Sequence, residues 1–210
     1  WALKGMETGF QALLVTSGTY YLLNILMNNK NDYTKLAVIQ SLAVLLRVDM
    51  FILVLVLNIF LLIKFLQTKN FLNQHLVTTK VLRYLIIILT PVILYEVFRI
   101  LYFGDIFPNT YYLKLYGVPL IPRLLQGSRS LLNFVNFTPM IVILLTLYSI
   151  HQIKKTKIMV TSVMIASFTL YSIYVGGDVW ENEGIIANRF VAFFMPLVFV
   201  LFSSFMLDIS

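Results

Sequence analysis

Charged and amide side chains that could bind a phosphate and a polar substrate are concentrated in residues 95–134 of this 210-residue chain. They stand among closely spaced Tyr and Phe residues, and they are Arg99, Asp105, Asn109, Lys114, Arg123 and Arg129. Arg can bind phosphate through two parallel hydrogen bonds, and Lys binds it as a point charge. Carboxylates and amides could hold the hydroxyl groups of a polar substrate. An aromatic belt with Lys and Arg reaching to the membrane surface is the alternative explanation.

Ionisable residues also occur where the surrounding sequence is apolar. Arg47 and Asp49 interrupt a long apolar run in LLRVDMF. Ionisable groups at membrane depth indicate a functional site, and a structural ion pair is the alternative. Glu96 and Arg99 are three residues apart, so they can pair on one face of a helix. Glu7 in GMETGF is either part of a site or a solvated residue near a helix N-terminus.

A second polar segment occupies residues 174–194. Gly176 and Gly177 allow backbone conformations that other residues avoid, and Asp178 follows them directly. Arg189 opens the next apolar run. The segment is either part of a site or an ordinary polar loop that reverses the chain.

The elements that carry these residues must be membrane helices. Hydrophobic residues make up 60% of the chain and charged residues 12%, whereas a soluble domain has about a quarter charged residues. The mean hydropathy is +0.87. Several apolar runs approach the ~20 residues that cross a bilayer, and they are continuous rather than alternating. The sequence therefore predicts an all-α, polytopic transmembrane bundle.

Six to seven membrane segments are expected within a single transmembrane domain that covers residues 1–210. Their predicted bounds are about 9–28, 35–47, 50–66, 82–102, 132–151, 158–176 and 190–208. The segment PRLLQGSRSLLNFV is predicted to form an interfacial amphipathic helix that leads into the span at 132–151.

Within residues 35–66 we prefer a hairpin over one broken helix. A turn near Arg47 and Asp49 gives one side of the membrane three basic loops, which are 29–35, 64–83 and 151–157. Asp32 is the only acid in them, so this side is predicted to face the cytoplasm. The opposite side receives nearly all the acids and all the polar segments described above. This topology explains the net charge of +7 without a nucleic-acid partner, and it predicts membrane lipids as partners.

No cysteine is present, so neither a disulfide nor a thiolate metal site is expected in this chain. His75 and His151 are far apart in the sequence and are predicted to lie in basic loops. Two solvated histidines are therefore the preferred interpretation, and no metal site is expected.

Four segments stand in a characteristic order: GMETGF at 5–10, LLRVDMF at 45–51, RILYFGDIFPNTYYLK at 99–114 and YVGGDVWENEGIIANRF at 174–190. The set resembles a bacterial group in the GT-C superfamily of membrane glycosyltransferases, which includes the mycobacterial terminal arabinofuranosyltransferase. The family pattern is similar to G-L-E-T, R-P-D, R-x-x-Y-Y-G-D-x-x-P-N-T-x-x-x-K and G-G-D-F followed by Arg. Val48 replaces the usual proline, and residues 179–188 form a longer link than usual.

Matching positions imply a role for ten residues. The cations expected to bind the donor phosphate are Arg99, Lys114 and Arg189. The candidate bases within this chain are Asp178 and Asp105. The residues expected to bind the sugar or acceptor, or to support the site, are Glu7, Arg47, Asp49, Asn109 and Thr110. The family's usual base lies in an acidic loop before the first segment, so we expect this chain to be a piece of a longer protein.

The resemblance implies transfer of a sugar from a polyprenyl-phosphate donor to a glycan or lipid acceptor of the cell envelope. The reaction would take place on the extracytoplasmic face of the inner cell membrane. Arg and Lys can stabilise the charge that develops on the leaving phosphate, so no metal or other cofactor is expected. A transporter or lipid flippase is the alternative, because such proteins use discontinuous helices near mid-membrane. A non-catalytic membrane subunit is a third hypothesis.

Overall fold

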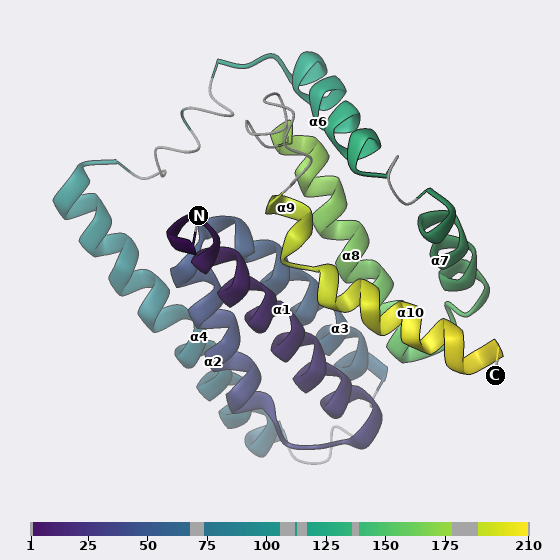
Figure 1. Cartoon of the computed structure of the whole chain (residues 1–210). Coiled ribbons are helices and arrows are strands. Elements are labelled where there is room, and N and C mark those ends of the chain that lie inside the picture. Colours follow the sequence, from purple (N-terminus) through teal and green to yellow (C-terminus); the bar gives the residue numbers. More distant parts are fainter. Residues whose placement is uncertain are drawn as a thin grey trace. The chain divides into compact units, whose positions relative to one another are not determined.

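The computed structural model describes residues 2–67, 74–105, 112, 117–135, 139–177 and 189–209. Every regular element in these ranges is a helix (Figure 1), which confirms the all-α prediction. The elements are α1 (Ala2–Asn28), α2 (Tyr33–Leu46), the 3-10 turn η1 (Val48–Met50), α3 (Phe51–Gln67), α4 (Gln74–Phe103), α6 (Leu120–Val135), α7 (Pro139–His151), α8 (Thr156–Val175), α9 (Arg189–Ala192) and α10 (Met195–Ile209).

Four of the described helical segments are long and apolar enough to cross a membrane. They are Glu7–Asn28, Val48–Gln67, Val81–Phe103 and Thr156–Val175. Helices α2, α7 and α10 are apolar but shorter. The prediction of a helical membrane protein is thereby supported, while the number of six to seven membrane segments stays a prediction.

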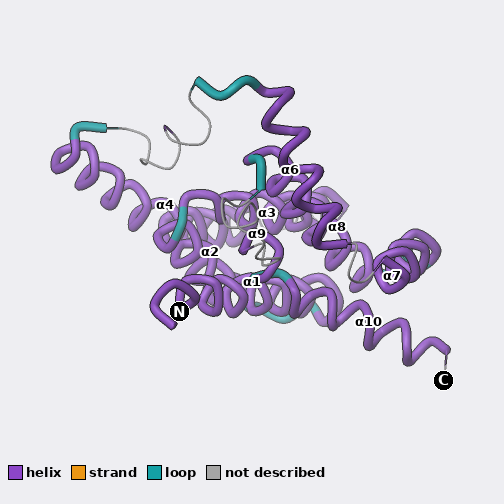
Figure 2. Tube along the Cα trace, turned by 45° about the horizontal axis from the view of Figure 1, so that its top comes forward, coloured by secondary structure: helices purple, strands orange, loops and turns teal. Residues whose placement is uncertain are grey.

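The chain divides into two compact units, and the tube in Figure 2 traces their helices. Unit 1 comprises Trp1–Ala12 and Phe107–Ser210, and unit 2 comprises Leu13–Ile106. The residues implied by the family resemblance are divided between them: Arg47, Asp49, Arg99 and Asp105 belong to unit 2, whereas Glu7 and Arg189 belong to unit 1.

Unit 2 contains a helical hairpin within the long apolar run. Helix α2 ends at Leu46 and α3 begins at Phe51, so the chain turns at Arg47–Met50. The Asn58 amide of α3 donates to Gln40 Oε1 of α2 at 3.0 Å, which places the two helices side by side. The Tyr84 hydroxyl of α4 reaches the same amides, at 2.9 Å from Asn58 Oδ1 and 3.1 Å from Gln40 Oε1. This polar triad ties α2, α3 and α4 together.

The end of α1 is fixed by a cation from α3. Lys64 Nζ donates to the carbonyl oxygen of Ile25 and to Asn29 Oδ1, the latter at 2.7 Å. The last carbonyls of a helix lack partners within the helix, and a cation is favoured at this negative end of the helix dipole. The C-terminal ends of α1 and α3 therefore lie at the same end of unit 2.

Unit 1 is built around α8. Phe168 of α8 is fully buried, and its ring meets Phe193 edge to face at 4.7 Å between centroids. Phe193 and Phe194 separate α9 from α10, although the sequence predicts one segment over 190–208. The physical reason is Pro196, which lacks an N–H and whose ring would clash with the carbonyl of Ala192, four residues earlier. Helix α9 ends at that residue.

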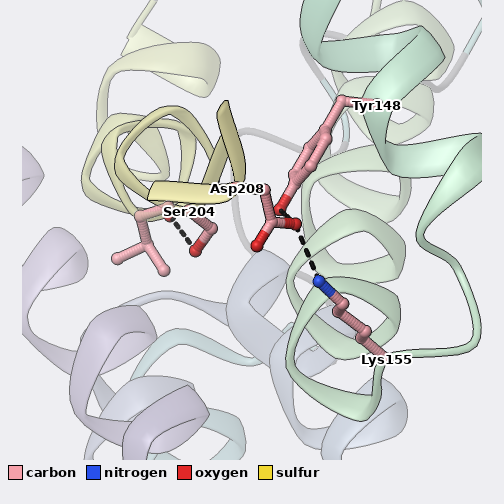
Figure 3. A network of polar contacts seen from close by, with 5 residues as sticks. Tyr148, Lys155, Ser204 and Asp208 are labelled. Carbon is pink, nitrogen blue, oxygen red and sulfur yellow. Dashed lines mark hydrogen bonds and ion pairs between the residues drawn. The ribbon is translucent and has the colours of Figure 1, made fainter. Parts of the chain in front are cut away.

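A network of polar contacts joins the other end of α8 to α7 and α10 (Figure 3). Asp208 Oδ2 accepts from the Tyr148 hydroxyl at 2.9 Å and from Lys155 Nζ at 2.7 Å. A carboxylate near the C-terminus of a helix is unfavourable, and these two donors offset that cost. Ser204, one turn earlier in α10, donates instead to the Val200 carbonyl at 2.8 Å. The network fastens the C-terminal end of α10.

Helix bounds differ from prediction in one more region. The sequence predicts one span over 132–151, whereas residues up to Val135 belong to α6 and α7 begins at Pro139. Helix α6 itself begins at Leu120, as the predicted amphipathic segment requires. His75 lies in the first turn of α4 and His151 is the last residue of α7, so the prediction that both lie in loops is wrong for these positions.

Candidate functional site

The turn between α2 and α3 is organised by an ion pair. Arg47 adopts an extended backbone, with φ −155° and ψ 136°, and this ends α2. Its Nε and Nη2 atoms donate to Asp49 Oδ1 and Oδ2 at 3.0 and 2.9 Å. The two side chains are only 22% and 12% exposed. The two parallel hydrogen bonds neutralise both charges within the turn. The geometry therefore also agrees with the alternative explanation, in which Arg47 and Asp49 form a structural ion pair.

The C-terminal end of α4 carries a second pair and an exposed carboxylate. Arg99 Nη2 lies 2.8 Å from Glu96 Oε2, which confirms the predicted pairing. Arg99 is only 7% exposed, and its Nε finds no acceptor within the described part of the chain. Asp105 follows Gly104, whose φ of 76° turns the chain away from the helix, and Asp105 is exposed. Arg99, which has one unused N–H donor, therefore lies within two helical turns of the carboxylate residue Asp105.

These groups gather at one end of unit 2. Helices α2 and α4 run in the same direction in Figure 1, so the Arg47–Asp49 turn lies at the same end of the unit as the C-terminal end of α4. Lys64 and the α1 terminus that it caps lie at the opposite end. The Arg47–Asp49 and Glu96–Arg99 pairs are therefore separated from the end of unit 2 at which Lys64 lies.

In unit 1 the paired glycines end α8. Gly176 and Gly177 have φ values of 91° and 77°, which favour glycine. Gly177 N donates to Ser172 O at 3.0 Å and Gly176 N donates to Ile173 O at 3.1 Å. This is the hydrogen-bond pattern of a Schellman motif, which satisfies the last carbonyls of a helix. The glycines thus have a structural role, and they fix the point at which the chain leaves α8 toward Asp178.

Arg123 of α6 lies against this turn, although the residues implied by the family resemblance do not include it. Its guanidinium carbon lies 4.6 Å from the centroid of the Tyr174 ring, and the residue is only 7% exposed. Its Cγ is 3.1 Å from the position that a Cβ at Gly176 would take, so only glycine fits without a shift. One sequence feature could have pointed to this contact of Arg123. Arg123, Gly127 and Ser130 recur on one face of the predicted amphipathic helix.

Arg189 begins α9 beside the same part of α8. The Phe190 ring lies 6.0 Å from the Tyr171 ring of α8. The positions of Arg123 and Arg189 therefore both lie near the last turns of α8, where the helix dipole favours positive charge.

Glu7 is an exposed residue in the second turn of α1. A capping residue would lie at the start of the first turn, so Glu7 does not cap this helix.

Four predicted site residues lie outside the described residues, and they are Asn109, Thr110, Lys114 and Asp178. Among the described residues, no three His, Cys, Asp or Glu side chains come together in a way that could hold a metal ion.

In comparisons with known proteins, no family model, no curated protein and no solved structure matches the chain.

Proposed function

We propose that the protein is a membrane glycosyltransferase that transfers a sugar from a polyprenyl-phosphate donor to a cell-envelope glycan or lipid on the extracytoplasmic side. The observation that carries the proposal is the C-terminal end of α8. There Arg123 lies against the Gly176–Gly177 turn, after which Asp178 follows in the sequence, and α9 begins beside the last turns of α8. A cation held at this helix end supports the proposal, because an arginine is a suitable partner for a phosphate ester.

The chemistry needs positive charge at the leaving phosphate. Breakage of the bond between the sugar and the phosphate leaves a lipid phosphate, whose growing negative charge Arg and Lys can stabilise without a metal. The family resemblance assigns this charge to Arg189 and Lys114, and also to Arg99, whose Nε donor is unused within the described part of unit 2. Asp178 or Asp105 takes the proton from the acceptor hydroxyl if no base outside this chain does so.

Transfer of labelled sugar from a polyprenyl-phosphate donor tests the proposal in membranes from cells that carry the native gene. Arg189→Ala and Lys114→Ala are each expected to lower the rate by 10²-fold or more, the order seen when a group that stabilises transition-state charge is removed. Lys30→Ala is the matched control, because Lys30 is an exposed cation of the basic loop between α1 and α2. Its rate should not change.

Unchanged transfer in both variants would remove the phosphate site from these residues, and absence of transfer by the wild-type protein would remove the proposal. A transporter or flippase is the second candidate, because the triad of Gln40, Asn58 and Tyr84 places hydrogen-bonding groups between the apolar helices of unit 2. In that case the lipid-linked sugar would cross the bilayer of reconstituted vesicles intact, without loss of its sugar.

A further inference from the structure

Three helix ends meet at one place in unit 1. Helix α7 ends at His151, α8 begins at Thr156, and Asp208 stands one residue before the end of α10. Asp208 accepts hydrogen bonds from Tyr148 of α7 and from Lys155, which lies in the connection between α7 and α8 (Figure 3). The last turns of α7 and α10 and the first turn of α8 are therefore held together.

Within the described residues, three lysines at this end share one carboxylate. Lys155 Nζ is paired with Asp208 at 2.7 Å, and Lys157 is close enough for its charge to act on the same carboxylate. The ion pairs among the described residues do not include Lys154 or Lys157. Lys154 is exposed and Lys157 is partly exposed. This end therefore keeps a surplus of positive charge after the pair of Lys155 and Asp208 has formed.

Exposed apolar side chains accompany these lysines. Ile150 of α7, Ile153 of the connection and Leu207 of α10 are 66%, 42% and 74% exposed. Helix α8 is long and apolar enough to span a bilayer, and this candidate span begins at Thr156. The lysines on either side of that residue therefore lie where the hydrocarbon core gives way to the headgroup layer. This end thus offers apolar groups to acyl chains and cations to a negatively charged headgroup.

We propose that Lys154 and Lys157 bind the phosphate group of an anionic membrane lipid, whose acyl chains lie against the exposed end of α7 at Ile150. Lys binds phosphate as a point charge, and basic residues at a membrane surface attract anionic lipids. The sequence predicts membrane lipids as partners of all the basic loops. The proposal assigns one binding site and one class of lipid to the connection between α7 and α8, and it does not depend on the enzymatic proposal.

A free phosphate ion is a poorer fit to this end. It would leave Ile150 and Ile153 facing water, which is unfavourable for apolar side chains. A lipid matches both kinds of group at once, because its phosphate and its acyl chains belong to one molecule. Asp208 is a weak obstacle to the phosphate, since Lys155 offsets the charge of its carboxylate.

Quenching of a local fluorophore tests the proposal, because the chain contains no cysteine. Ile150→Cys would carry one bimane label in vesicles of phosphatidylcholine and phosphatidylglycerol, with the acyl chains of one lipid brominated at a time. At equal mole fraction, brominated phosphatidylglycerol should quench the label more strongly than brominated phosphatidylcholine, until the site is saturated. The two quenching curves give the affinity of the anionic lipid relative to that of the neutral one.

Removal of either lysine should weaken this preference. Lys154→Gln and Lys157→Gln are each expected to lower the relative affinity about fivefold, from the free energy that one basic residue gains beside an anionic membrane surface. Lys155 stays in place in these variants because it holds Asp208. Lys30→Gln is the matched control, since Lys30 is an exposed cation of the loop between α1 and α2. It should leave the preference at position 150 unchanged.

Three results would overturn the site. The first is equal quenching by the two lipids, or a preference that persists when Lys154→Gln and Lys157→Gln are combined. The second is loss of the preference when inorganic phosphate is added at constant ionic strength, because the lysines would then bind a free anion. The third is no quenching by either lipid, because protein would then cover Ile150. Circular dichroism of each variant would show that its helices are intact, and none of these results depends on sugar transfer.

Discussion

Gly127→Ala should separate α6 from α8. The added methyl group would lie 2.7 Å from Ile173 Cα and 2.8 Å from Ile173 C, in contact with backbone that cannot rotate away. Carbon atoms prefer separations of about 3.5–4.0 Å, so one helix must retreat by about 1 Å. That shift also weakens the stacking of Arg123 on Tyr174, one turn away.

The expected magnitude follows from two opposing effects. Overpacking of a close contact costs about 1–3 kcal/mol, whereas Ala in place of Gly favours a helix interior by up to about 1 kcal/mol. The free energy of unfolding should therefore fall by roughly 1–2 kcal/mol. Reversible unfolding in mixed micelles, as the fraction of denaturing detergent increases and helicity is followed by circular dichroism, would measure it.

Gly9→Ala is the matched control. Gly9 also lies inside a helix of unit 1, but a Cβ at this position would meet nothing within 4 Å. Its unfolding free energy should stay level or rise by up to about 1 kcal/mol from helix propensity alone. Equal behaviour of the two variants would refute the close contact between α6 and α8.

Two further predictions concern unit 2. Tyr84→Phe removes the hydroxyl that lies between the Gln40 and Asn58 amides, so the unfolding free energy should fall by about 1 kcal/mol in the same titration; an unaltered value would show that the triad does not hold the three helices. Asp49→Asn leaves Arg47 charged in a mostly buried turn and should cost about 1–3 kcal/mol, reduced by its partial exposure. Adding Arg47→Met should recover part of that loss, whereas additive losses would contradict direct pairing.

Most helices could be predicted because a continuous apolar run is a strong signal. The residues at which the helices end were harder to predict. The turn at Arg47–Asp49 was predictable, since an unbroken helix would carry both charges to mid-membrane. The separation of α9 from α10 depends on Pro196, a local signal that an apolar segment of 19 residues masks. The pairing of Glu96 with Arg99 followed from helical spacing alone.

The contacts of the candidate site were less predictable, because they depend on which helices pack together. Spacing identifies Gly176 and Gly177, but only the positions of Ser172 and Ile173 show that they close a Schellman motif. Arg123 is among the cations of residues 95–134, but the family resemblance gives it no role, because it belongs to none of the four segments that carry the resemblance. Its importance arises from a tertiary contact with Tyr174, which no pattern within the α6 sequence specifies.

Helix α6 shows why amphipathicity does not specify which residues of a helix contact its neighbour. The period of its sequence defines an apolar and a polar face. The structure divides the polar residues: Arg123 and Ser130 are buried, whereas Gln126, Arg129 and Asn133 are exposed. Gly127 lets the backbone of α6 approach that of α8 at Ile173. The sequence pattern of α6 alone therefore does not decide which of its residues pack against α8, because that choice depends on the surface of the neighbouring helix.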